Sequence, residues 1–129
     1  MYCMILYCFR DKPKKIVDEG VQKIIDKVVK RKVEVTDEEI VDRMMLPMIF
    51  ECARCLEENI VGTPQEVDMG LLLGLGFPPF RTGALKYADT EGLQNIVDKA
   101  GRFAELGKMY APTEGFLERA KNNQNYYQG

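Results

Sequence analysis

The first candidate for a functional motif in this sequence is a group of three closely spaced glycines, which could form a phosphate-binding loop. Gly70, Gly74 and Gly76 lie within an apolar run, and the sequence Pro-Pro-Phe-Arg follows at 78–81. A dinucleotide-binding loop needs G-x-G-x-x-G between a strand and a helix, but here the third glycine is missing. A phosphate-binding P-loop is excluded because no Gly-Lys-Ser or Gly-Lys-Thr occurs. The pattern favours the end of a helix and a rigid turn.

Four cysteines and the absence of histidine restrict the remaining chemistry. Without histidine, this chain has no Ser-His, Cys-His or His-Glu mechanism of its own. Nothing in the sequence marks secretion, so a disulfide scaffold is not expected for Cys3, Cys8, Cys52 and Cys55. The two close pairs would allow a four-cysteine zinc site, but Cys52 and Cys55 fall inside a long helical pattern instead of a turn. We therefore expect no metal site, and zinc is kept as a third, weaker alternative.

The composition is that of an ordinary single domain. The chain has 129 residues, 46% of them hydrophobic, and a formal net charge of −2. It lacks the basic excess of most nucleic-acid-binding proteins. The apolar stretch 2–9 is too short to span a membrane and has no basic residue before it, so we expect neither a membrane span nor a signal peptide, and a cytoplasmic location. Residues 1–13 are expected to be an irregular lead-in or linker, and residues 14–129 a helical domain with a polar tail.

Apolar spacing and capping signals predict an all-α fold. Thr36 with Glu39 predicts a capping box, Thr63 with Pro64 and Glu66 is a second helix start, and Thr113 is expected to cap the last helix. Asn59 is expected to end the longest helix in the left-handed conformation. Pro47 lies inside the longest pattern and predicts a kink near residues 43–47. We expect a compact multi-helix bundle around this long, proline-kinked central helix. The expected helices are 14–32, 37–59, 64 to about 74–76, 83–87, 91–106 and 114–121.

Three co-linear stretches carry a family resemblance. They are TDEEIVDRMMLPM (36–48), ECARCLEENIV (51–61) and PQEVDMGLLLGLGFPPFRTGAL (64–85). Together they resemble the C-terminal helical domain of 3-hydroxyacyl-CoA dehydrogenases, and more closely the last domain of the bacterial multifunctional fatty acid oxidation complex alpha subunit. The resemblance runs from about residue 12 to 127, and residues 1–9 fit least well.

The resemblance implies a parent protein with an enoyl-CoA hydratase/isomerase part, an NAD-binding dehydrogenase part and two related helical domains. The catalytic His-Glu pair lies in the nucleotide-binding part, so we expect this chain alone to have no catalytic residue, bound cofactor or dehydrogenase turnover. NAD is the cofactor implied for the parent. The implied partners are the remaining domains of the parent chain and a thiolase subunit.

Two sites on the long helix are candidate substrate or interdomain contacts. In the first helical domain of the family an Asn-Arg pair begins this helix and the Asn contacts substrate, whereas the matching pair here is Asp42-Arg43. An ionised Asp only accepts hydrogen bonds, which favours the second, non-catalytic copy. The alternatives for this pair are a residual acyl-CoA or interdomain contact and a solvated helix start. Glu51 is either an interdomain salt-bridge partner or a surface charge.

The turn after the glycine run supplies the other candidates. Phe77 and Phe80, held by the two prolines, form a rigid apolar knob that packs either on a neighbouring domain or in this core. Arg81 is a candidate for contact with a CoA phosphate. The methionines at 44, 45, 48 and 69 are interpreted as adaptable core packing.

Two functions follow from these observations. The first is an architectural C-terminal domain of a multifunctional fatty acid beta-oxidation enzyme. The alternative is a free-standing helical interaction or dimerisation module without catalysis, which would form a homodimer through apolar surface left exposed.

Overall fold

The computed structural model of the protein describes residues 7–8, 16–29 and 33–127, which belong to two units, residues 1–35 and 36–129. In the first unit, strands β1 (Tyr7–Cys8) and β2 (Ile16–Val17) form a two-residue antiparallel pair. The predicted boundary between residues 13 and 14 falls outside the described residues and stays a prediction.

Helix α1 (Glu19–Val28) follows β2 in the first unit. It begins later than the predicted residue 14, because Asp18 caps it by accepting hydrogen bonds from the backbone N–H groups of Gly20 and Val21 at 2.7 and 3.2 Å. Its apolar side chains Ile24 and Val28 are exposed.

The longest helix of the second unit is α2 (Asp37–Glu57), and it begins where predicted. The Thr36 hydroxyl accepts a hydrogen bond from the Glu39 N–H at 3.2 Å. The return half of the predicted capping box is not formed, since the Glu39 carboxylate lies 3.8 Å from the Arg43 guanidinium instead. Asn59 adopts the predicted left-handed conformation, with φ of 55°.

Pro47 lies inside α2 without ending it. A proline has no N–H, so the carbonyl of Arg43, four residues earlier, loses its helical donor. The Tyr110 hydroxyl, from the second half of the unit, donates to this carbonyl at 3.4 Å. This contact compensates in part for the missing helical bond, while the kink itself stays a prediction.

Helix α3 (Pro64–Leu75) shows that the glycine run is the end of a helix. The predicted capping box is confirmed: the Thr63 hydroxyl accepts from the Glu66 N–H, and the Glu66 carboxylate accepts from the Thr63 N–H at 3.1 Å. Gly76 ends the helix in the left-handed conformation, with φ of 66°. The short 3₁₀ turn η1 (Pro79–Arg81) follows.

The predicted helix over 91–106 is too long, because in the structure this segment holds the last residue of one helix, a second helix and a 3₁₀ turn. Gly92 has a φ of 88°, a conformation that suits glycine and breaks the helical ladder there. The elements around this break are α4 (Ala84–Glu91), α5 (Leu93–Gly101), and the 3₁₀ turns η2 (Ala104–Leu106) and η3 (Lys108–Tyr110).

Helix α6 (Glu114–Asn122) begins at Thr113 as predicted, with the Thr113 hydroxyl accepting from the Phe116 N–H at 3.2 Å. The polar tail predicted after it is only partly right. Tyr126 is buried and Tyr127 is half-buried, because both pack back onto the helices.

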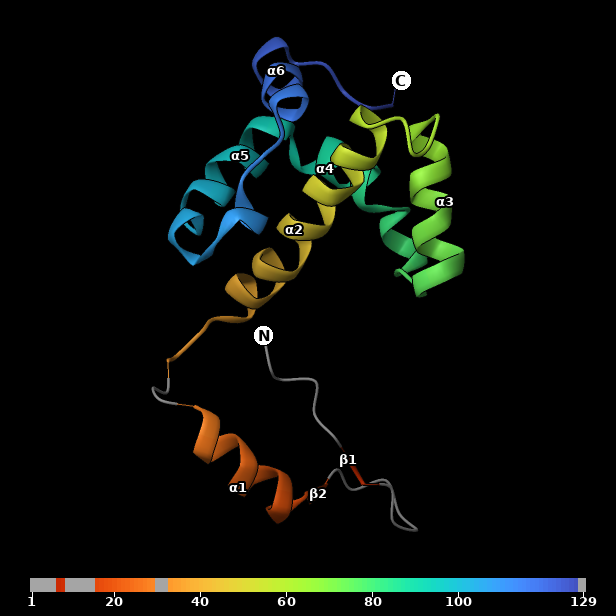
Figure 1. The fold of residues 1–129 in the computed structure, drawn as a ribbon. Coiled ribbons are helices and arrows are strands. Elements are labelled where there is room, and N and C mark those ends of the chain that lie inside the picture. The colour runs from red at the N-terminus through yellow and green to blue at the C-terminus, as the bar shows by residue number, and fades with distance from the viewer. Residues whose placement is uncertain (1–6, 9–15, 30–32, 128–129) are drawn as a thin grey trace. The chain divides into compact units, whose positions relative to one another are not determined.

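The core of the second unit surrounds the C-terminal half of α2. Phe50 of α2 meets Phe116 of α6 edge to face, with ring centroids 5.2 Å apart. Figure 1 shows α2 crossing the unit, with α4, α5 and α6 packed around it and α3 at its edge. The largest fully buried side chains are Phe50, Phe116, Leu46, Ile49, Leu85 and Ile96. The all-α class is therefore confirmed.

The methionine prediction holds only in part. Met45 and Met48 pack against the core, but Met44 and Met69 are exposed. None of the helices in the described segments is long and apolar enough to cross a membrane.

Gly83 is held close to a buried carboxylate at the start of α4. The Asp68 carboxylate accepts hydrogen bonds from the Leu85 and Lys86 N–H groups, each at 3.0 Å, and so supplies the cap that Gly83 cannot. A Cβ on residue 83 would lie 2.1 Å from the Asp68 Cγ. The packing of α3 against α4 therefore requires glycine here.

We expect Gly83→Ala to lower the free energy of unfolding by about 3 kcal/mol, because the new methyl group must displace Asp68 from the α4 amides. The matched control is Gly70→Ala, whose Cβ meets nothing within 4 Å inside helix α3. This change should raise the stability by about 0.5–1 kcal/mol through helix propensity. Urea unfolding measures both, and equal effects of the two substitutions would contradict the close packing described at Gly83.

Candidate functional site

The start of α2 contains a buried ion pair at the first candidate position. Asp42 is 5% exposed, so the alternative of a solvated helix start is wrong for this residue. Its carboxylate accepts a hydrogen bond from the Lys99 ammonium of α5 at 3.0 Å, and the Glu91 carboxylate lies 3.6 Å from the same ammonium. The hydrogen bond to Asp42 raises the pKa of Lys99. In this arrangement the Asp42 carboxylate is bound to a lysine of the same unit instead of to a ligand.

A shallow hollow of about 320 Å³ lies next to this pair. Its lining combines three carboxylates with one guanidinium and one aromatic ring. Arg43 is not part of the lining, and its guanidinium lies 3.8 Å from the Glu39 carboxylate. Arg102 is the one cation among these lining side chains, so the hollow offers little positive charge to the phosphates of an acyl-CoA. The lining residues are Thr36, Glu38, Glu39, Asp42, Arg102 and Phe103.

Glu51 lies on the outer side of α2. Its side chain is mostly exposed and pairs with Arg54 one turn later. Such an exposed i,i+3 pair contributes little to stability. The structure thus places Glu51 at the surface, away from the buried pair of Asp42.

The predicted knob after α3 divides between the core and the surface. Phe77 is buried in this unit, whereas Phe80 is 82% exposed. The Arg81 guanidinium stacks on the rings of Phe80 and Tyr87, with distances to the ring centroids of 5.6 and 4.9 Å. Of the six sequence candidates, the structure therefore stacks Arg81 on Phe80, whereas Phe77 is buried in the core. Asp42 is paired with a lysine elsewhere in the unit.

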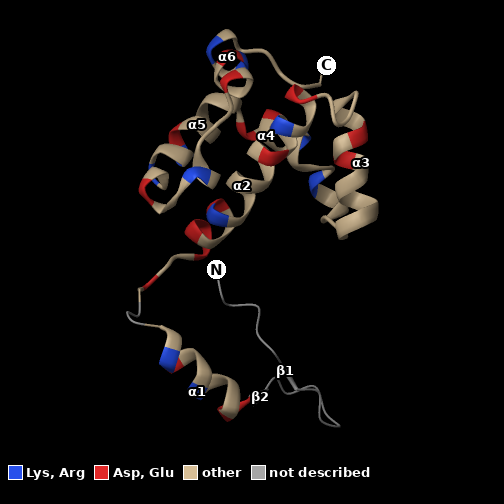
Figure 2. Cartoon of the chain, in the orientation of Figure 1, with Lys and Arg blue, Asp and Glu red and all other residues tan. Residues whose placement is uncertain are grey.

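The exposed side of α3 extends the surface around Phe80. No residue from 69 to 80 carries a charge, and Figure 2 shows acidic residues only near the start of α3. Leu73 and Leu75 are 81% and 73% exposed, and Met69 is 54% exposed. We call these exposed apolar residues of α3 and of the turn after it, Met69, Leu73, Leu75 and Phe80, the α3 apolar face. Exposed apolar side chains gathered in one short, uncharged segment are typical of a binding interface.

Sequence reasoning missed most of the α3 apolar face, because it interpreted Met69 as core packing and did not name Leu73 or Leu75 as candidates. The sequence nevertheless contains a signal for this exposed surface. The run from 69 to 80 is apolar on every side of the helix, whereas a helix at the surface of a single domain has a polar side. Lys99 was also missed, and no local pattern links it to Asp42, which lies 57 residues earlier.

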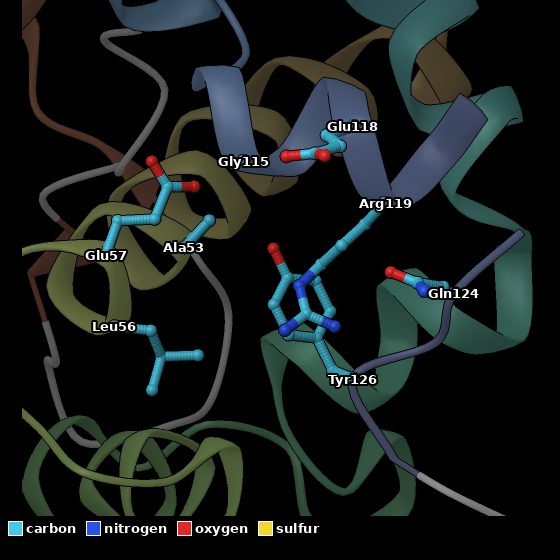
Figure 3. A pocket seen from close by; sticks show the side chains of 8 residues that line it. All are labelled: Ala53, Leu56, Glu57, Gly115, Glu118, Arg119, Gln124 and Tyr126. Carbon is cyan, nitrogen blue, oxygen red and sulfur yellow. The ribbon is translucent and has the colours of Figure 1, made fainter. Parts of the chain in front are cut away.

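A second hollow, of about 360 Å³, lies between the end of α2 and α6. Figure 3 shows the Arg119 guanidinium stacked on the Tyr126 ring, at 4.8 Å from the centroid. The Glu57 carboxylate accepts a hydrogen bond from the Thr113 hydroxyl. Among the residues that line this hollow, no nucleophilic side chain is paired with a base. The lining residues are Ala53, Leu56, Glu57, Gly115, Glu118, Arg119, Gln124 and Tyr126.

The described cysteines do not form a reactive site. Burial, followed by the nearby Asp68 charge, raises the pKa of the Cys52 thiol to about 12. Cys55 is half-buried, and both are free thiols. Within the described segments, no three side chains of Cys, Asp or Glu gather as metal ligands would. Cys3 and the side chain of Cys8 lie outside those segments, so the four-cysteine zinc alternative stays untested.

These features define an all-α domain in which the buried carboxylates are paired and α3 carries an exposed apolar face. Residues 40–126 match the family described as 3-hydroxyacyl-CoA dehydrogenase, C-terminal domain. Because the match covers most of the chain, the chain belongs to this family.

The curated relatives point to a larger protein. The chain is 48% identical over 118 residues to the fatty acid oxidation complex subunit alpha of Pseudomonas aeruginosa (strain LESB58). The same identity and length hold for the subunits of that name from Ectopseudomonas oleovorans and Pseudomonas putida (strain GB-1). In each case the match covers 92% of this chain and 16% of the relative. The chain therefore spans about a sixth of the length of these proteins.

We expect Lys99→Met to lower the free energy of unfolding by about 2 kcal/mol at neutral pH, because it leaves the Asp42 carboxylate buried without its cation. Since the pKa of Lys99 is raised, the pair stabilises the fold below the ordinary lysine pKa, about 10.4, and this contribution disappears as the pH rises through the higher folded value. Urea unfolding from about pH 7 to 11 measures the difference. The double variant Asp42→Leu/Lys99→Met is the control and should recover part of the loss. A pH-independent loss would contradict the ion pair.

Cys52 should resist alkylation in the folded protein, because its thiol is buried and its raised pKa keeps it protonated near pH 8. N-ethylmaleimide followed by peptide mass spectrometry should show Cys55 modified at least ~100-fold faster than Cys52. In urea the two rates should converge. Equal rates in the native protein would contradict the burial of Cys52.

Proposed function

We propose that the chain is an architectural docking domain of a fatty acid oxidation complex alpha subunit. Its α3 apolar face packs on another part of that subunit. The remaining parts of the parent hydrate enoyl-CoA and oxidise 3-hydroxyacyl-CoA to 3-oxoacyl-CoA with NAD. A thiolase subunit is a further partner of the parent, and the expected location is cytoplasmic. The family membership and the 48% identity to these subunits support this proposal.

The single observation that carries the docking role is the α3 apolar face. Met69, Leu73, Leu75 and Phe80 expose between 54% and 82% of their area, although α3 begins with a well-formed capping box. In water this exposure is unfavourable, at roughly 25 cal/mol for each Å² that a partner would bury. A partner that covers the face therefore gains free energy from apolar surface that this fold leaves open.

The charged candidate residues Asp42 and Arg81 contribute to the structure of the domain more than to substrate binding. The Asp42 carboxylate is already occupied by Lys99, and the adjoining hollow is lined by carboxylates. Arg81 stacks on two aromatic rings next to the α3 apolar face. In the proposal its guanidinium orients Phe80 for docking, and the CoA-phosphate role is secondary.

A free-standing dimerisation module is the second candidate, because the same uncharged face would allow two copies to pack through α3. Light scattering after size-exclusion chromatography separates the two candidates. A chain of 14.8 kDa that stays monomeric alone, but binds the rest of a related alpha subunit, supports the docking domain. A stable dimer that does not bind that subunit supports the module.

The docking test uses the Pseudomonas putida alpha subunit from which the segment matching this chain has been removed. The chain should bind this protein, and Leu73→Glu or Phe80→Glu should weaken binding at least ~10-fold, because each buries a charge at the interface. Both residues are more than 80% exposed, so thermal unfolding of the free chain should hardly change.

The matched control for docking is Leu106→Glu, which makes the same change at an exposed leucine of η2. This variant should bind as tightly as the unaltered chain does. Equal binding of all the variants would overturn the assignment of the face. The chain alone should show no turnover with acetoacetyl-CoA and NADH, and robust turnover would overturn the architectural role.

A further inference from the structure

The α3 helix is anchored to the rest of its unit mainly near its first turns. Only Val67 and Asp68 of this helix are buried, and the residues after them are half-buried or exposed. Phe77, just beyond the helix, is the next buried residue. The position of the α3 apolar face thus depends strongly on what holds Asp68 and the neighbouring first turn.

The chain end supplies contacts at this anchor. The Tyr127 hydroxyl donates a hydrogen bond to the Asp68 carboxylate at 2.8 Å, and the Pro64 carbonyl oxygen lies 3.3 Å from the same hydroxyl. Burial, and then the bond to Asp68, raises the pKa of Tyr127, so the hydroxyl keeps the proton that it donates. The Lys86 ammonium lies over the Tyr127 ring, 5.0 Å from its centroid.

The backbone of the same segment is fixed to α4 by a second carboxylate. Both oxygens of Asp89 accept main-chain hydrogen bonds, one from the Tyr126 N–H at 2.9 Å and one from the Tyr127 N–H at 2.8 Å. The Tyr126 ring is buried next to Phe116 of α6, with centroids 6.1 Å apart. Residues 126–127 therefore connect three helices: α3, α4 and α6.

We propose that residues 126–127 form a C-terminal clasp that sets the position of α3. The Tyr127 hydroxyl holds the first turns of α3 through Asp68, and Asp89 and Phe116 hold the tyrosines in place. When the clasp opens, α3 loosens while α2, α5 and α6 keep their core. The consequence for docking rests on the proposed function: an open clasp leaves the α3 apolar face without a fixed position and weakens binding of the partner.

Hydrogen–deuterium exchange of the full chain tests the clasp. Tyr127→Phe keeps the ring over Lys86 but removes the hydroxyl, so the amides of residues 70–76 should exchange about tenfold faster or more. The amides at the centre of α2 should not change. Asp89→Ala, which removes both backbone anchors from the other side of the clasp, should cause the same local acceleration.

The matched control is Tyr126→Phe, which removes a hydroxyl that donates no hydrogen bond to the described residues and retains the ring and the backbone bond to Asp89. It should leave exchange in α3 unchanged. The clasp is overturned if Tyr127→Phe leaves exchange at 70–76 unchanged, if it accelerates α2 and α3 equally, or if Tyr126→Phe has the same effect.

Binding to the shortened alpha subunit is measured separately from hydrogen exchange, so the failure of one proposal can be told from the failure of the other. If the unaltered chain does not bind the shortened alpha subunit, the proposed function fails, whereas the exchange result for the clasp still stands. If the chain binds and Tyr127→Phe speeds exchange in α3 without weakening binding, the clasp exists but does not control docking, which overturns that consequence.

Discussion

The buried carboxylate of Asp68 is the constraint on which the rest of the helical unit depends. It is 2% exposed and accepts hydrogen bonds from two amides at the start of α4 and from the Tyr127 hydroxyl. The positive end of α4 and these three donors compensate for the loss of water around the charge. Because the donors come from distant parts of the chain, they fix α3, α4 and the C-terminal segment relative to one another. Gly83 follows from this, since any larger residue would displace the carboxylate.

Local sequence signals predicted the elements that depend on local chemistry. The caps at Thr36, Thr63 and Thr113 and the helix end at Gly76 are formed by hydrogen bonds or backbone conformations within a few residues. The break at Gly92 was missed because the apolar spacing continues across it, and spacing does not register a single residue with positive φ. The start of α1 was placed too early because the apolar pattern begins before Asp18, which is the residue that caps the helix.

The candidate site could be predicted only where one stretch of sequence contains it. The turn with Phe77, Phe80 and Arg81 was found because its residues are adjacent, yet which ring points outward depends on tertiary packing. The pairing of Asp42 with Lys99, and of Asp68 with Tyr127, spans more than fifty residues and leaves no local pattern. The exposed leucines of α3 were not recognised as a binding surface because apolar residues are usually buried, whereas a surface that binds a partner leaves them exposed in the free chain.

The most direct measurement of the docking role is methionine oxidation by hydrogen peroxide, read by peptide mass spectrometry. Met69 of the α3 apolar face and Met109 of η3 are 54% and 53% exposed, so both should oxidise at similar rates in the free chain. Bound to the shortened alpha subunit of a relative, Met69 should be protected at least ~10-fold, while Met109 should keep its rate. Unchanged oxidation of Met69 in a complex that demonstrably forms would contradict the account.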